Sequence, residues 1–179
     1  MSARFATRSA RSAVESSLEL GTRAILLNVT TSEPRRILFL CSGNYYRSRF
    51  AELLFNHLAG ARKLDFLADS AGLRLDCSTL NPGPMSRHTM AALAERGVPL
   101  PAVLRAPRDV QRADVADSFL TVAVKEAEHR PLVMQLFPEL LDRVEFWHID
   151  DVGDAQPSVA IPMIESQVRA LVQRLATTR

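Results

Sequence analysis

The sequence of 179 residues contains few cysteines, few lysines and no long apolar run. Its two cysteines cannot form a disulfide framework or a four-thiolate zinc site, so we interpret each alone, as core filler or as a reactive thiol. We expect no metal site, because the four histidines show no ligand spacing with one another. A membrane-spanning helix needs about 18 or more apolar residues in a row, and no such run occurs. We therefore expect no membrane partner.

Charge and composition narrow the class further. The formal net charge is only +2, and nearly all of the positive charge is arginine, since Lys63 and Lys125 are the only lysines. A nucleic-acid binder usually carries a larger and more clustered positive excess, so we expect no nucleic-acid partner. Hydrophobic residues make up 47% and charged residues 23%, which excludes a disordered or fibrous chain and is typical of a globular domain with a core.

The first 34 residues differ from the rest of the chain. Residues 1–14 include three arginines, four serines or threonines and no acidic residue, a composition typical of an organelle-targeting presequence. A disordered tail, or a start codon placed too early, explains the same pattern, and we favour that interpretation. The apolar stretch at residues 24–29 is too short and too late for a secretory signal. We predict a poorly ordered N-terminal extension over residues 1–34, a domain over residues 35–179 and a cytoplasmic protein.

After Pro34, patterns typical of strands alternate with patterns typical of helices. Residues 37–40 form a continuous apolar run, as in a strand buried on both faces of a parallel sheet. Further strand patterns lie at residues 64–68, 118–124 and 144–148, and helical patterns lie at residues 50–60, 86–96, about 127 to before Pro138, and 161–175. His57 lies on the apolar stripe of the first helix and is expected at the edge of the core. The alternation implies a parallel α/β sheet.

The loop after the first strand carries the residues that suggest chemistry. It reads Cys41-Ser42-Gly43-Asn44-Tyr45-Tyr46-Arg47-Ser48 and links the strand to the first helix. Ligands bind where strand carboxyl ends meet helix N-termini, because backbone N–H groups and the helix dipole favour an oxyanion there. The same field favours the thiolate form of Cys41. Gly43 would permit the tight turn, and Arg47 would bind two oxygens of a tetrahedral anion.

These features describe a site for nucleophilic attack on a phosphoryl group. The alternative is structural, with Cys41 as a small buried hydrophobe and Arg47 as a solvated charge. The spacing alone is weak evidence in an arginine-rich chain. The position at the end of the first strand is what favours the catalytic interpretation.

The loop resembles that of the low-molecular-weight protein tyrosine phosphatase family, whose pattern Cys-x-Gly-Asn-x-x-Arg-Ser is met by Cys41, Gly43, Asn44, Arg47 and Ser48. The resemblance extends over about residues 35–175 and includes Asp69-Ser70-Ala71-Gly72, which looks like the family's Asp-Ser-Ala-Gly turn. It implies a four-stranded parallel sheet flanked by helices in three Rossmann-like layers, and catalysis without a metal or other cofactor. It also implies a phosphate-binding loop of Ser42, Gly43, Asn44, Tyr45, Tyr46 and Ser48.

Two supporting roles follow from the same resemblance. Ser48 would hydrogen-bond the Cys41 thiolate, and Asn44 with Ser70 would hold the unusual backbone of the loop. Ser48 also suits a helix N-cap, and the two roles are compatible.

A phosphatase also needs an acid that protonates the leaving oxygen. The resemblance places this aspartate after the last strand, where the sequence reads Trp147-His148-Ile149-Asp150-Asp151-Val152-Gly153-Asp154. Related arsenate reductases read Trp-x-x-Asp-Asp-Pro here, which favours Asp151, with Asp150 and Asp154 as reserves. A solvated turn carboxylate is the alternative for each of the three. Trp147 is expected to pack beside this turn.

Several positions depart from the family pattern. The aromatic residues that grip a phosphotyrosine ring after the acid are missing, and Tyr45 or Tyr46 would have to supply that wall, although buried packing suits Tyr46 equally. Tyr46 also replaces the family's second loop cysteine. The supporting histidine before the third strand has no match at residues 104–107. Residues 125–130 follow the third strand, and we favour a solvated helix start there over a substrate contact.

We therefore predict a phosphatase that hydrolyses a phosphate monoester, either phosphotyrosine or a small aryl or alkyl phosphate, through a phosphocysteine on Cys41. Arg47 would bind the dianion and Asp151 would act as the general acid. The partner is then a phosphorylated protein or a small phosphate ester. Two alternatives remain. A thiol-dependent arsenate reductase needs Cys77 close enough to Cys41 to form a disulfide, and a non-catalytic module would bind phosphorylated ligands without turnover.

Overall fold

The computed structural model of the chain describes residues 33–78, 81–149 and 156–177. Four parallel strands form one sheet in the order β2-β1-β3-β4: β1 (Arg35–Cys41), β2 (Phe66–Gly72), β3 (Leu120–Ala123) and β4 (Val144–Phe146). This confirms the predicted four-stranded parallel sheet. The extension predicted over residues 1–34 lies, except for its last two residues, outside the described range and stays a prediction.

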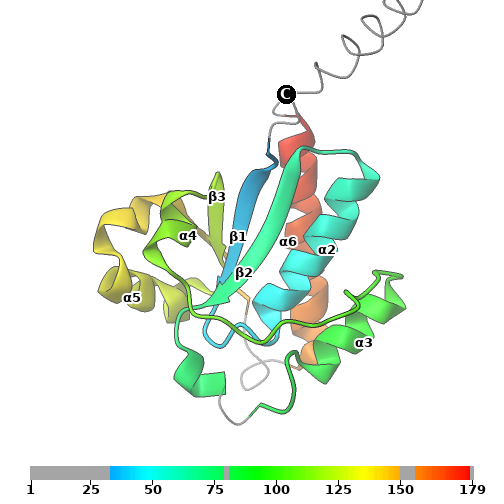
Figure 1. Cartoon of the computed structure of the whole chain (residues 1–179), viewed down its shortest axis with the longest axis horizontal. Coiled ribbons are helices and arrows are strands. Elements are labelled where there is room, and N and C mark those ends of the chain that lie inside the picture. The colour runs from blue at the N-terminus through cyan, green and yellow to red at the C-terminus, as the bar shows by residue number, and fades with distance from the viewer. Residues whose placement is uncertain (1–32, 79–80, 150–155, 178–179) are drawn as a thin grey trace, which may run out of the picture. The chain divides into compact units, whose positions relative to one another are not determined.

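Helices cover both faces of the sheet and give the predicted three layers (Figure 1). On one face lie α2 (Arg47–Ala61), α3 (Arg87–Glu95) and α6 (Pro157–Thr177). On the other face lie α4 (Arg112–Ala116) and α5 (Glu126–Leu136). Two 3-10 helices, η1 (Leu75–Ser78) and η2 (Pro138–Arg143), complete the described elements. The sequence pattern had not predicted α4, η1 or η2.

The apolar run of β1 is buried on both faces, as predicted. Ile37 and Phe39 point into the core beneath α2 and α6, whereas Leu38 and Leu40 point into the core beneath α5, and each is at most 1% exposed. Successive strand residues alternate between the two faces of a sheet, so only a continuous apolar run satisfies both cores. β1 thereby becomes an interior strand that ends at Cys41.

The long helix α6 presents one apolar stripe to the sheet. Its buried residues are Ala160, Ile161, Ile164, Val168, Leu171, Val172 and Leu175. Their spacing of three and four residues puts them on one side of a helix. Val159 and Met163 lie outside this stripe and are about half exposed, at 52% and 42%. In the part of the chain that the structure describes, no helix is long and apolar enough to cross a membrane.

The second strand differs from its prediction. β2 begins at Phe66 rather than Leu64, because the Leu64 N–H donates to the Ala59 carbonyl and ends α2, and Lys63 adopts a left-handed φ of 53°. Asp69-Ser70-Ala71-Gly72, expected as a turn, is instead the last part of β2. β3 and β4 are shorter than predicted. His57 is exposed rather than at the core edge.

Candidate active site

Cys41 is the last residue of β1 and lies against the first turn of α2. Its side chain is buried, and its Sγ lies 3.0 Å from the Ser48 hydroxyl. The expectation that Ser48 caps α2 is wrong, because the helix begins one residue earlier, at Arg47, and the cap position is Tyr46, whose side chain makes no capping hydrogen bond. The Ser48 hydroxyl is therefore directed to the thiol rather than to the helix end.

Arg47 is fully buried beside the loop, with 1% of its surface exposed. Its Nη1 donates to the Ile149 carbonyl at 3.2 Å and to Glu128 Oε2 at 3.0 Å, and its Nη2 donates to Glu128 Oε1 at 3.3 Å. Ile149 directly precedes Asp150 in the sequence. The arginine therefore contacts both α5 and the start of the segment that carries the candidate acids.

Asn44 holds the one left-handed turn of the loop, with φ of 48°. Its Nδ2 donates to Ser70 Oγ at 2.8 Å and to Ser48 Oγ at 3.1 Å. Its Oδ1 accepts from Arg105 Nη1 at 2.9 Å and from the Arg108 N–H at 3.1 Å. The tight turn expected at Gly43 therefore falls at Asn44, where four hydrogen bonds offset the cost of a left-handed conformation.

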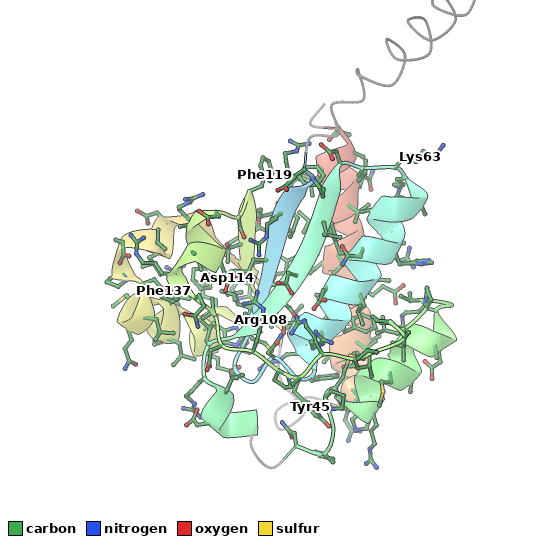
Figure 2. All side chains as sticks on the ribbon, viewed as in Figure 1. Tyr45, Lys63, Arg108, Asp114, Phe119 and Phe137 are labelled. Atoms are coloured by element: carbon green, nitrogen blue, oxygen red, sulfur yellow. The ribbon has the colours of Figure 1, made fainter. Side chains whose placement is uncertain are left out.

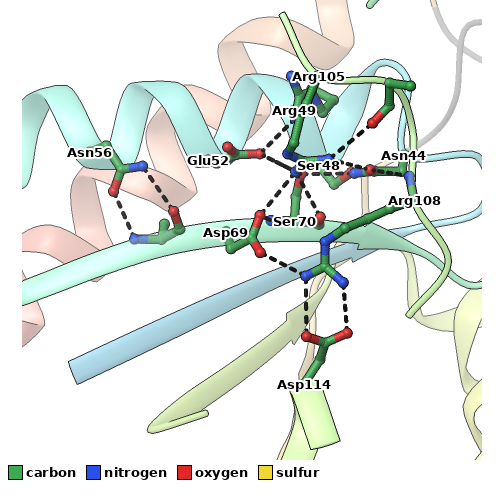
Figure 3. A network of polar contacts seen from close by, with 12 residues as sticks. Asn44, Ser48, Arg49, Glu52, Asn56, Asp69, Ser70, Arg105, Arg108 and Asp114 are labelled. Carbon is green, nitrogen blue, oxygen red and sulfur yellow. Dashed lines mark hydrogen bonds and ion pairs between the residues drawn. The ribbon is translucent and has the colours of Figure 1, made fainter. Parts of the chain in front are cut away.

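Arg105 anchors a charged network beneath the loop (Figure 3). Its Nη2 donates to Glu52 Oε2 at 2.9 Å, to Asp69 Oδ1 at 3.0 Å and to the Ser70 carbonyl at 2.8 Å. Glu52 is buried and also accepts from Ser70 Oγ at 2.5 Å and from Arg49 at 3.3 Å. Burial lowers the pKa of the Arg49 guanidinium, although the charge of Glu52 opposes this shift.

The network continues from Asp69 on β2 to Arg108 and to Asp114 on α4 (Figure 3). Arg108 lies 2.7 Å from Asp69 and 2.7 Å from Asp114. Burial alone would lower the pKa of Arg108, but its hydrogen bonds to both carboxylates outweigh burial and raise it. Burial alone would raise the pKa of Asp114, but the hydrogen bond from Arg108 lowers it. Both groups are therefore charged. The ion pairs of Arg108 connect the network beneath the loop to β2 and to α4.

Gly72 lets β2 approach the loop closely. A Cβ at this position would lie 2.9 Å from the Ser42 carbonyl oxygen and 2.6 Å from Leu75 Cδ2. The following residues continue the contact, since the Leu73 N–H donates to the Cys41 carbonyl and the Arg74 N–H donates to the Ser42 carbonyl, each at 2.9 Å. A residue with a side chain would displace the loop or the strand end.

The two loop tyrosines differ in environment. Tyr46 is 5% exposed and packs in the core, with its carbonyl accepting from Thr89 Oγ1 at 3.1 Å. It therefore does not form a wall of the substrate site. Tyr45 is only partly buried, and its hydroxyl donates to the Pro82 carbonyl at 2.8 Å (Figure 2). Of the two tyrosines, only Tyr45 is exposed enough to form an aromatic wall of the substrate site.

The expectation of a solvated helix start at residues 125–130 is wrong for two side chains. His129 is fully buried, and Glu128 binds Arg47. Trp147 is buried and packs on Phe39, with ring centroids 5.7 Å apart, whereas the turn beside which it is expected to pack lies outside the described residues. Asp150, Asp151 and Asp154 lie outside the described residues, as does the side chain of Cys77 in η1.

Over the described residues, no group of three or more histidine, cysteine or carboxylate side chains could hold a metal ion. The loop instead offers a thiol, a buried guanidinium and the start of a helix. These groups favour a bound tetrahedral oxyanion beside a nucleophile.

At the carboxyl edge of β1, an interior parallel strand, the loop runs from the thiol of Cys41 to Arg47 with five residues between them. A family model described as low molecular weight phosphotyrosine protein phosphatase matches residues 36–178, and the chain belongs to this family. A phosphatase of this kind acts on phosphorylated substrates.

Solved structures share the fold. A low molecular weight protein tyrosine phosphatase from T. tengcongensis is 25% identical, with a TM-score of 0.63 and coverage of 81% of this chain and 99% of that one. Wzb from Vibrio vulnificus in complex with benzylphosphonate is 19% identical, with a TM-score of 0.66 and coverage of 78% and 98%. The YwlE arginine phosphatase from Geobacillus stearothermophilus is 22% identical, with a TM-score of 0.63 and coverage of 80% and 94%. A comparison with curated proteins gives no match.

Sequence reasoning missed three side chains around the loop. Arg105 lies in the segment at residues 104–107 where the family's histidine had no match, and its long side chain reaches Asn44. Glu128 and His129 lie one turn into α5 and reach Arg47 and Ser42. For Glu128 and His129, the available signal was their position after β3, at the same sheet edge as Cys41. Ligand-binding groups of α/β sheets gather at this edge.

Proposed function

We propose that the protein hydrolyses a phosphate monoester through a phosphocysteine on Cys41. The thiolate attacks phosphorus, the bond to the leaving oxygen breaks, and Asp151 gives that oxygen its proton. The Asp151 carboxylate then takes a proton from water, which attacks phosphorus and breaks the S–P bond. Inorganic phosphate leaves and the thiolate is restored.

The observation that carries this proposal is the contact between Cys41 and Ser48. The Ser48 hydroxyl lies 3.0 Å from Sγ, and with Cys41 as a thiolate it would donate to the sulfur, so the helix start would support the nucleophile and the sulfur leaving group of the second step. Arg47 lies at the same helix start, where its guanidinium would bind the equatorial oxygens in the transition state. The structural alternative, with Arg47 as a solvated charge, disagrees with its 1% exposure.

Asp151 remains our choice for the acid because its segment begins at the loop. Ile149 accepts a hydrogen bond from Arg47, and Asp151 follows two residues later. Glu128 is the described carboxylate on Arg47, but its hydrogen bonds keep it ionised, so it cannot donate a proton.

For the substrate we propose an aryl or alkyl phosphate monoester, with phosphotyrosine among the candidates. The partly exposed Tyr45 is the loop residue able to contact an aromatic leaving group. One structural neighbour holds benzylphosphonate and another is an arginine phosphatase, so the substrate panel should include both kinds of phosphoryl group. The cytoplasmic location and the poorly ordered extension at residues 1–34 stay predictions.

The deciding experiment is turnover of an aryl phosphate by the wild-type chain and by Cys41→Ser. We expect hydrolysis by the wild type, capture of a phosphorylated Cys41 on rapid quenching, and phosphate binding without turnover by the variant. Arsenate reduction that depends on a thiol reductant and is lost in Cys77→Ser would favour the reductase. Phosphate binding by an inactive wild type would favour the binding module.

A further inference from the structure

The first turn of α5 places a carboxylate on the arginine of the loop. Glu128 accepts two hydrogen bonds from Arg47, at 3.0 Å from Nη1 and 3.3 Å from Nη2. Both terminal nitrogens are thus engaged by one carboxylate, in the paired geometry that fixes the plane of a guanidinium. The Ile149 carbonyl adds a third contact, at 3.2 Å from Nη1.

The carboxylate of Glu128 is itself held from the side of the loop. The hydroxyl of Ser42, the residue after Cys41, donates a hydrogen bond to Glu128 Oε1. The Lys125 N–H donates to His129 Nδ1 at 3.1 Å, so the ring proton lies on Nε2. That nitrogen lies 3.2 Å from Ser42 Oγ and 3.5 Å from Glu128 Oε2. Loop and helix therefore share one hydrogen-bonded cluster.

This cluster keeps Glu128 charged. Burial alone would raise the pKa of its carboxyl group, but hydrogen bonds from His129, Arg47 and Ser42 outweigh burial and hold the pKa well below its ordinary value. The charge of Glu128 partly cancels that of Arg47, so the pair adds little to the attraction for a phosphate dianion. What the pair supplies is a fixed direction for the guanidinium.

We infer that Glu128 is a positioning residue that orients Arg47 toward the transferring phosphoryl group. This inference rests on the proposed phosphatase function. A guanidinium held in the transition-state orientation loses no freedom at the moment of reaction, and a small misplacement costs up to about 10²-fold in rate. Ser42 and His129 act on Arg47 indirectly, because they contact the Glu128 carboxylate that orients it.

The test separates rate from affinity. Glu128→Gln keeps the shape of the side chain but loses the charge, so it weakens the paired contact with Arg47. We expect its kcat for an aryl phosphate to fall about 10–100-fold. The competitive inhibition constant of inorganic phosphate should be lowered, or raised by less than about threefold, because removal of the Glu128 charge does not weaken the attraction of Arg47 for a dianion. Glu126→Gln is the matched control, because Glu126 lies in the same helix turn and binds Arg130 and His148 instead. We expect wild-type kcat from it.

Three outcomes would overturn the inference. They are a kcat for Glu128→Gln within twofold of the wild type, a rise in kcat, or a loss of phosphate affinity as large as the loss of kcat. If Glu128→Gln does not fold, Ser42→Ala takes its place, and we expect a smaller fall in kcat with no comparable loss of phosphate affinity. A wild type that turns over no phosphate ester would refute the proposed function instead.

Discussion

The guanidinium of Arg105 donates to the side-chain carbonyl of Asn44 at 2.9 Å, and this contact supports the left-handed turn of the loop at residues 41–48. Arg105 lies in the segment at residues 104–107, where the sequence offers no match to the histidine that the family resemblance implies. Its other terminal nitrogen reaches Glu52 and Asp69, so the loop rests on ion pairs as well as on neutral hydrogen bonds.

Replacing Arg105 with alanine should loosen the loop and destabilise the protein. The change leaves Asn44 Oδ1 short of one donor and the buried Glu52 short of one cation, and each unsatisfied polar group costs about 1–3 kcal/mol. We expect a lower free energy of unfolding in denaturant and a fall in kcat/KM of roughly tenfold or more. Arg112→Ala removes an exposed pair with Glu139 and should leave the free energy of unfolding nearly unchanged. Equal effects of the two variants would contradict the role of Arg105.

Replacing Arg47 with lysine should remove most of the activity. The three N–H donors of an ammonium group cannot reproduce both the paired contact with Glu128 and a paired contact with two oxygens of a phosphoryl group. The loss of such a donor lowers kcat by about 10²–10³. Steady-state kinetics with an aryl phosphate measure the effect, and a lysine variant with near wild-type kcat would refute the assigned role.

Asp151→Asn should lower kcat by roughly 10²–10⁴, the usual contribution of a positioned general acid. The loss should be largest for alkyl phosphates, whose leaving oxygen cannot depart unprotonated, and smallest for a phosphate of an acidic phenol. Asp150→Asn and Asp154→Asn are the controls, with expected changes under about tenfold. A leaving-group-dependent loss in Asp150→Asn instead would move the acid by one residue.

Gly72→Ala should displace the phosphate-binding loop. The new methyl group would lie 2.9 Å from the Ser42 carbonyl oxygen, so loop or strand must move, at a cost of about 1–3 kcal/mol in the free energy of unfolding. Gly60→Ala is the matched control, because a Cβ there meets nothing within 4 Å and the residue is helical. It should stabilise the protein by up to about 1 kcal/mol. Thermal unfolding and kcat/KM together distinguish the two.

Glu165→Gln should reduce stability in a pH-dependent way. Arg96, at the end of α3, lies 2.5 Å from Glu165 on α6. Burial would raise the pKa of Glu165, but hydrogen bonds from Arg96 and Arg169 lower it below the value of about 4.3 expected for the unfolded chain. A lowered pKa stabilises the fold above the unfolded value, and this stabilisation is lost as the pH falls through the folded value.

The difference in unfolding free energy between wild type and Glu165→Gln should therefore be constant near neutral pH and shrink below about pH 4. Glu95→Gln is the control, since Glu95 is 74% exposed and lies 3.7 Å from Arg96. A difference that does not change with pH would show that Glu165 acts through packing alone.

Local sequence patterns predicted β1, which ends at Cys41, and the helix α6. The apolar run at residues 37–40 and the stripe on α6 depend only on burial periodicity, which neighbours in sequence reveal. The loop was recognisable because its residues are contiguous. The start of β2 was misplaced because the Leu64 N–H donates to the Ala59 carbonyl at the end of α2. Hydrophobic periodicity does not reveal this hydrogen bond.

The supporting residues were beyond such patterns because their partners are distant in sequence. Arg105 contacts Asn44 across 61 positions, and Glu128 contacts Arg47 across 81. An arginine or glutamate at the start or end of an element usually faces solvent, so composition alone favours a solvated side chain. Only the strand order shows that these side chains meet at the loop.

The separation along the sequence between Arg47 and its partners also determines when the site can form during synthesis. The loop leaves the ribosome early, but Glu128 and Ile149 follow Arg47 by 81 and 102 residues. Growing chains emerge N-terminal end first, so a nascent chain holds the thiol and the arginine long before the groups that orient them. A truncated product that ends before residue 128 therefore keeps the whole loop sequence but lacks the carboxylate and the carbonyl that contact Arg47.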